Sequence, residues 1–103
     1  MYIIIWVFLA KPGREAEFEQ AYGPAGMWTS LFTRAQGYLG TELLQDPTRP
    51  GRYLTIDRWA SAAAYEAFRK QHADAYAAVD QVCEDLTEKE DAWGTWLPLP
   101  ETD

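Results

Sequence analysis

The fold is decided by residues 52–86, which read RYLTIDRWASAAAYEAFRKQHADAYAAVDQVCEDL. Residues 53–59 predict a strand, and the pattern becomes helical after Ser61, a residue type that favours the N-cap position. The alanines that follow have high helix propensity. Aromatic and apolar residues then recur three or four positions apart and share one helical face: Tyr65, Phe68, His72, Tyr76, Val79, Cys83 and Leu86. A kink near Ala73–Asp74 is left open.

Two residues of this apolar stripe carry reactive groups. His72 is the only histidine of the chain, and histidine is the side chain type best suited to act as a base near neutral pH. Two interpretations stay open for it, a base in a pocket and a structural residue at a core position. Cys83 is the only cysteine, so it forms no disulfide within the chain, and we expect a small buried apolar side chain.

The rest of the chain adds strands and helices on both sides of this segment. Residues 2–9, YIIIWVFL, are apolar at consecutive positions, which is typical of a strand covered on both faces. Gly40 marks a candidate β-bulge, or a close approach of another part of the chain, in the strand that precedes the hairpin loop. The remaining patterns predict strands at residues 37–45 and 90–97 and helices at residues 14–22 and 25–35.

The predicted order is strand, helix pair, strand, strand, long helix, strand. This βαββαβ order is that of an α+β, ferredoxin-like sandwich with a four-stranded antiparallel sheet and helices on one face. Residues 1–97 are predicted to form a single domain, and residues 98–103 an extended C-terminal tail. Because a strand as apolar as residues 2–9 needs cover on its second face, we expect a homodimer in which two sheets pack together.

The strand at residues 53–59 carries one acid and one base at adjacent positions, Asp57 and Arg58, which face opposite sides of the sheet. We expect Arg58 on the helix side, near a pocket mouth. The other face is then assigned to the dimer interface, with Tyr53, Thr55, Asp57 and Trp59.

Composition limits the range of partners. Nine Lys and Arg against sixteen Asp and Glu give a net charge of −7, which argues against nucleic acid or anionic membranes as partners. The longest apolar run is too short to span a bilayer, and we expect a cytoplasmic protein. Five Trp, six Tyr and four Phe are many for 103 residues and indicate an interface, a pocket, or both.

Three segments carry a resemblance to a known family. Residues 26–46 (GMWTSLFTRAQGYLGTELLQD), residues 53–68 (YLTIDRWASAAAYEAF) and a helix that ends in CEDLTE resemble the antibiotic biosynthesis monooxygenase domain family. The resemblance covers essentially the whole chain and implies the dimeric α+β barrel. It also implies a choice among cofactor-independent oxygenases of polyketide quinols, quinol monooxygenases, haem-degrading enzymes and members without a known reaction. The haem-degrading branch is associated with an Asn, a Trp and a His, and this chain has no Asn.

A cofactor-independent oxygenase acting on a quinol, anthrone or polyketide-like substrate needs one base and a dry aromatic pocket. We expect no cofactor, because the chain has neither metal-ligand spacing nor a glycine-rich phosphate loop. The candidate base is His72, and the candidate substrate-binding residues are Trp28, Phe32, Arg58, Tyr65, Phe68 and Tyr76. A non-catalytic homodimeric protein that binds a small aromatic ligand is the alternative, and a purely structural dimer comes third.

Overall fold

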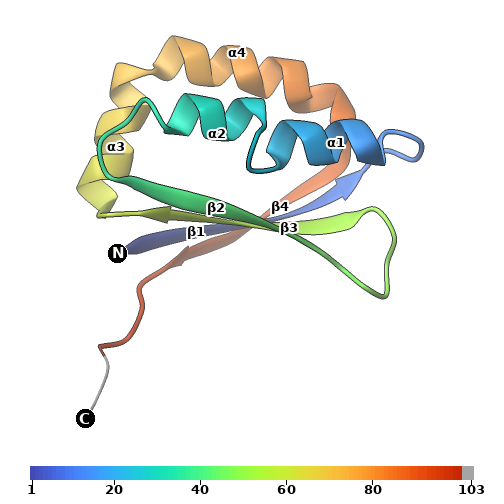
Figure 1. Cartoon of the computed structure of the whole chain (residues 1–103), viewed down its shortest axis with the longest axis horizontal. Coiled ribbons are helices and arrows are strands. Elements are labelled where there is room, and N and C mark those ends of the chain that lie inside the picture. Colours follow the sequence, from blue (N-terminus) through green and yellow to red (C-terminus); the bar gives the residue numbers. More distant parts are fainter. Residues whose placement is uncertain (101–103) are drawn as a thin grey trace.

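A four-stranded antiparallel sheet lies under a layer of helices in the computed structural model, which describes residues 1–100 (Figure 1). The strands are β1 (Tyr2–Ala10), β2 (Tyr38–Gln45), β3 (Arg52–Trp59) and β4 (Thr87–Trp96), in the spatial order β2-β3-β1-β4. The helices are α1 (Glu15–Tyr22), α2 (Met27–Phe32), α3 (Ala62–Gln71), α4 (Ala73–Cys83) and the short 3-10 helix η1 (Glu84–Leu86). The predicted ferredoxin-like α+β fold is confirmed.

The C-terminal end of the chain is only partly described. Residues 97–100 follow β4 without regular secondary structure, and residues 101–103 of the predicted tail lie outside the described residues. No helix among residues 1–100 is long and apolar enough to cross a membrane.

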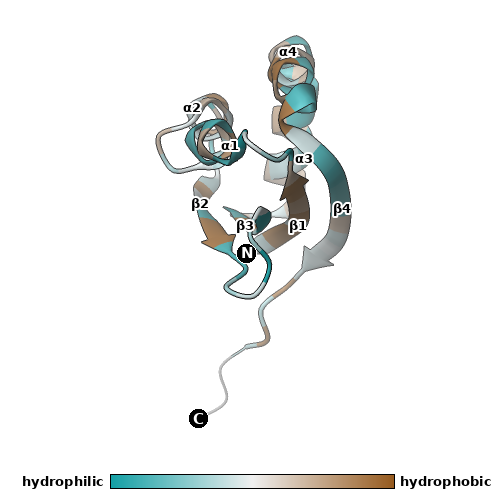
Figure 2. Ribbon diagram, turned by 90° about the vertical axis from the view of Figure 1, so that its right-hand side faces the viewer, coloured by the Kyte–Doolittle hydropathy of each residue, from teal (hydrophilic) through white to brown (hydrophobic). Residues whose placement is uncertain are grey.

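β1 is the central hydrophobic strand of the sheet. It pairs with β3 on one side and with β4 on the other, and Figure 2 shows it as strongly hydrophobic. Ile4 and Phe8 are buried beneath the helices, whereas Ile3 and Ile5 on the opposite face stay partly exposed. The continuous apolar run therefore covers two faces: the helices cover one, and on the other Val7 is buried whereas Ile3 and Ile5 are partly exposed.

The register between β1 and β3 shows which face of β3 meets the helices. Ile4 lies opposite Asp57 and Phe8 opposite Tyr53, and directly opposed residues share a face. All four residues expected on the far face are buried on the helix side: Tyr53, Thr55, Asp57 and Trp59. The predicted faces of β3 are thus wrong, and the assignment of these residues to a dimer interface loses its basis.

The physical reason for the reversal is volume. The Tyr53 and Trp59 rings on this face of β3 occupy part of the space between the helices and the sheet, and Trp59 is fully buried. Leu54 and Ile56, which were expected there, are partly exposed on the other face. A strand with apolar residues on both faces does not reveal by alternation alone which face the helices cover.

The long helical segment is broken once, at His72. Ser61 caps its start, because its Oγ accepts a hydrogen bond of 3.1 Å from the Ala64 amide. His72 has φ −119° and ψ 30°, outside the helical region, so α3 ends before it and α4 begins after it. The break lies one residue before the kink left open from the sequence. The predicted stripe faces inward, and Phe68 and Cys83 on it are each 1% exposed.

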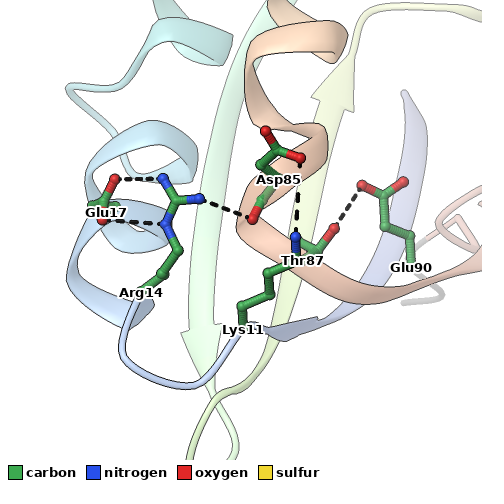
Figure 3. Close-up of polar contacts among 6 residues, drawn as sticks. All are labelled: Lys11, Arg14, Glu17, Asp85, Thr87 and Glu90. Carbon is green, nitrogen blue, oxygen red and sulfur yellow. Dashed lines mark hydrogen bonds and ion pairs between the residues drawn. The ribbon is translucent and has the colours of Figure 1, made fainter.

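One end of the helical layer is tied together by charged side chains (Figure 3). Arg14, just before α1, pairs with Glu17 at 2.8 Å and donates a hydrogen bond of 3.1 Å to the backbone carbonyl of Asp85 in η1. The Lys11 amide also donates to the Leu86 carbonyl at 2.9 Å. These contacts join the start of α1 to the segment that leads into β4.

Candidate functional site

A cavity of about 330 Å³ lies between the helices and the sheet. Its walls come from every strand and from each of the helices α1 to α4, so the whole fold is needed to form it. Six of its lining residues are aromatic: Trp6, Phe8, Tyr22, Trp28, Phe32 and Tyr76. The rings support one another, since Trp28 lies 5.0 Å from Tyr76 and 5.8 Å from Phe32, measured between centroids. Such walls favour a flat apolar ligand.

Asp57 is the buried carboxyl group of this cavity. It projects from the helix side of β3 and is 9% exposed. Thr41 of β2 lies directly opposite it in the register and donates a hydrogen bond of 2.6 Å from Oγ1 to Oδ1 of Asp57. Burial raises the pKa of Asp57 from 3.8 to about 6, although the Thr41 hydrogen bond acts in the opposite direction. A carboxylate of this kind is a stronger base than one in water.

The exposed charged residues that complete the cavity lining are Arg69, Asp80 and Glu90. The Arg69 guanidinium lies 3.9 Å from the centre of the Tyr76 ring and donates a hydrogen bond of 3.0 Å to the Tyr65 hydroxyl. Partial desolvation of the carboxyl against the cavity raises the pKa of Glu90, and this carboxylate accepts a hydrogen bond from Thr87 at 3.3 Å (Figure 3). Burial also raises the pKa of Tyr76 to about 12, so its hydroxyl keeps its proton at neutral pH.

Among the predicted substrate-binding residues, Trp28, Phe32 and Tyr76 line the cavity. Phe68 is buried beneath it, with its ring centroid 5.5 Å from that of Phe32 and outside the lining. Tyr65 does not line the cavity; its hydroxyl accepts a hydrogen bond from Arg69, which does.

The structure does not bring His72 and Arg58 into the cavity lining. His72 lies at the junction of α3 and α4, and its ring centroid is 5.5 Å from that of Phe68. Arg58 lies on the opposite face of the sheet, where it pairs with Glu42 of β2. Its expected position at a pocket mouth is wrong, because Arg58 lies on the face of β3 that points away from the helices.

Several cavity residues were missed by the sequence reading, above all Asp57 as a cavity group, Thr41 and Arg69. One signal for Asp57 was available, namely a single acid within a strand of otherwise apolar and uncharged helix-facing residues. A buried charge is costly, so its presence there indicates a role beyond packing. Within residues 1–100 no group of three or more His, Cys, Asp and Glu side chains forms a candidate metal centre.

Comparison with known proteins agrees with the fold. The crystal structure of a mutant of SnoaB, a cofactor-independent oxygenase from Streptomyces nogalater, matches with a TM-score of 0.80 at 17% identity, over 97% of this chain and 94% of that one. A candidate antibiotic biosynthesis monooxygenase from Bordetella bronchiseptica matches with a TM-score of 0.73 at 26% identity, over 96% and 97% of the two chains. No curated protein sequence matches significantly. The family model described as antibiotic biosynthesis monooxygenase matches residues 1–81, and the chain therefore belongs to this family.

Proposed function

We propose that this protein is a cofactor-independent monooxygenase that oxidises a small aromatic substrate in the cavity between the helices and the sheet. The observation that carries the proposal is the Asp57 carboxyl, buried at a cavity that six aromatic side chains also line. Membership of the family and the similarity to SnoaB, itself a cofactor-independent oxygenase, support the reaction class. Quinols, anthrones and related hydroxylated polycycles are the substrate class that these walls suit.

In this proposal Asp57 acts as the general base. With a pKa of about 6 it is mostly ionised at pH 7 to 8, yet it binds a proton more strongly than an ordinary carboxylate does. It removes a proton from the substrate, and the resulting anion is rich enough in electrons to reduce O₂ directly. A methylene group between aromatic rings then becomes a carbonyl, one oxygen atom enters the product, and the other leaves as water. The substrate supplies all the electrons, so atoms and charge balance.

The size and lining of the cavity support a single flat ligand. Ligand pockets in proteins commonly measure roughly 300–1,000 Å³, and a cavity of about 330 Å³ is at the small end of that range. A ligand that fills the cavity would displace water from around Asp57, which strengthens the interaction of the carboxylate with a bound phenol or quinol.

His72 remains the competing candidate for the base. A pair of variants separates the two assignments, Asp57→Asn and His72→Ala, assayed for O₂ consumption with a panel of quinols and anthrones. Loss of a general base typically costs about 10²–10⁴-fold in rate. We expect that loss in Asp57→Asn and a rate near wild type in His72→Ala. The reverse result would return the role to His72.

The alternative function is a non-catalytic protein that holds an aromatic ligand in the same cavity. Fluorescence titration of the cavity tryptophans with the same compounds under anaerobic conditions measures binding without chemistry. Binding together with O₂-dependent product supports the enzyme. Binding without any O₂ consumption across the panel would favour the accessory role.

We also propose that two copies of the chain pack through the sheet face opposite the helices. That face carries partly exposed aliphatic side chains on β1 and β3, and Trp93 and Trp96 on β4 are about half exposed. Burial of such a surface favours association. Sedimentation equilibrium tests the proposal, with a dimer mass expected and a monomer at micromolar concentration as the contrary result.

A further inference from the structure

Two hydroxyl groups, from Tyr38 and Thr41, lead to the Asp57 carboxyl in a row of hydrogen bonds. Thr41 Oγ1 lies 2.6 Å from Asp57 Oδ1, and the Tyr38 hydroxyl lies 2.6 Å from the same Thr41 oxygen. A threonine hydroxyl has one hydrogen, and Thr41 donates it to the carboxylate. Tyr38 must therefore donate to Thr41, so the three groups are ordered in one direction when Asp57 is ionised.

This row of hydrogen bonds depends on a bulge in β2. Thr41 lies opposite Asp57 and Tyr38 opposite Trp59, so β2 has one residue more than β3 between the two pairs. Gly40, with φ 137°, lies at the register shift, which confirms the bulge expected there. In a regular strand, residues three apart face opposite sides of the sheet. The bulge places Tyr38 and Thr41 on the same side as Asp57.

The other charged and titratable groups of the cavity are Tyr22 of α1, Arg69 of α3, Tyr76 and Asp80 of α4, and Glu90 of β4. None of them forms an ion pair or hydrogen bond with Asp57 within residues 1–100, where the carboxyl accepts a hydrogen bond from Thr41. When a ligand fills the cavity, the open side is blocked by the ligand itself. The hydroxyl chain then remains as the connection between the buried carboxyl and Tyr38, which is partly exposed on the edge strand β2.

We propose that Thr41 and Tyr38 form a proton relay, which carries the proton that Asp57 takes from the cavity ligand out to the edge of the sheet. The relay rests on the proposed function. The protonated carboxyl gives its proton to Thr41, Thr41 gives its own to Tyr38, and Tyr38 releases one to water. Each O–H bond that breaks is replaced by another, and Asp57 returns to the carboxylate without net change in the two hydroxyl groups.

The first test is a titration of the ligand-free protein, which is independent of any reaction. The side-chain carboxyl of Asp57 is followed by carbon-13 NMR in wild type, Thr41→Val and Thr41→Ser. Loss of a hydrogen bond to a charged group is expected to raise the pKa of Asp57 by about one unit in Thr41→Val, and Thr41→Ser should restore the wild-type midpoint. Thr55→Val is the matched control, because Thr55 lines the same cavity and is buried, and within residues 1–100 it makes no hydrogen bond to Asp57.

The second test uses Tyr38→Phe, which keeps the ring packed on Phe32 and Trp59 and removes only the hydroxyl. With an anthrone as the probe, this variant should complete a first turnover at the wild-type rate and slow repeated turnover at least about tenfold. An unchanged midpoint in Thr41→Val, or an unchanged steady-state rate in Tyr38→Phe, would overturn the relay. Failure of the proposed function gives a different result, a wild-type protein that consumes no O₂ while the Asp57 titration still depends on Thr41.

Discussion

Replacing Asp57 by asparagine should make the folded protein more stable at neutral pH. The pKa of this carboxyl rises from 3.8 in the unfolded chain to about 6 in the fold, because burial disfavours the charged form. The folded state therefore binds the proton more tightly, and stability falls as the pH rises from about 4 to about 6. The difference between the two values corresponds to about 3 kcal/mol of destabilisation at pH 8, about half of that near pH 5, and little at pH 4.

Asparagine has nearly the same shape and keeps an oxygen that accepts the Thr41 hydrogen bond, but it carries no charge. Asp57→Asn should thus gain up to about 3 kcal/mol at pH 8 and almost nothing at pH 4. For a domain of this size that gain corresponds to a rise in the melting temperature on the order of 10 °C. The variant should at the same time lose the proposed activity.

The assay is urea unfolding followed by tryptophan fluorescence, at several pH values between 4 and 8 and at one fixed protein concentration. Glu42→Gln is a suitable control, because Glu42 is an acid on the opposite, exposed face of the same sheet. A stabilisation of Asp57→Asn that is equal at pH 4 and pH 8, or a loss of stability at pH 8, would refute the reasoning that burial of this charge is costly.

Three further predictions concern the fold around the cavity. Arg58→Ala should leave the affinity for a cavity ligand within about twofold in calorimetric titration and cost less than about 1 kcal/mol of stability, because its partner Glu42 lies on the outer face; a tenfold loss of affinity would contradict its placement. Gly40→Ala should cost about 1–2 kcal/mol in urea unfolding, because φ is 137° although a Cβ would meet no atom within 4 Å, and an unchanged midpoint would argue against the bulge. Phe68→Ala should cost about 3–5 kcal/mol, since the ring is 1% exposed among other aromatic rings, and a loss below 1 kcal/mol would show that this core is loosely packed.

The elements could be predicted because their signals are local. The apolar run of β1, the helical spacing after Ser61 and the glycine of the β2 bulge are each properties of neighbouring residues, and each has its expected place in the structure. From the sequence, the end of α3 could be given only as an undecided kink near Ala73, because the φ and ψ angles of His72 depend on packing that its neighbours in the sequence do not encode.

The site could be predicted only in part, because it depends on which side of β3 the helices cover. Trp28, Phe32 and Tyr76 were found from helical spacing, which is unaffected by that choice. Asp57 was expected on the outer face and Arg58 at the cavity, and the structure has them the other way round, because the two faces of a strand exchange all their side chains together. Polarity suggested that the acid faces a partner, whereas in the structure it faces the cavity.

The measurement that tests the central claim most directly is the pH dependence of kcat/KM for O₂ consumption with an anthrone. A base must be unprotonated to act, so the rate should fall as the pH drops through the pKa of about 6 assigned to Asp57. We predict a half-maximal value near pH 6 in the wild type and in His72→Ala, and a rate that is low at every pH in Asp57→Asn. A wild-type profile that is retained in Asp57→Asn and lost in His72→Ala would contradict the account.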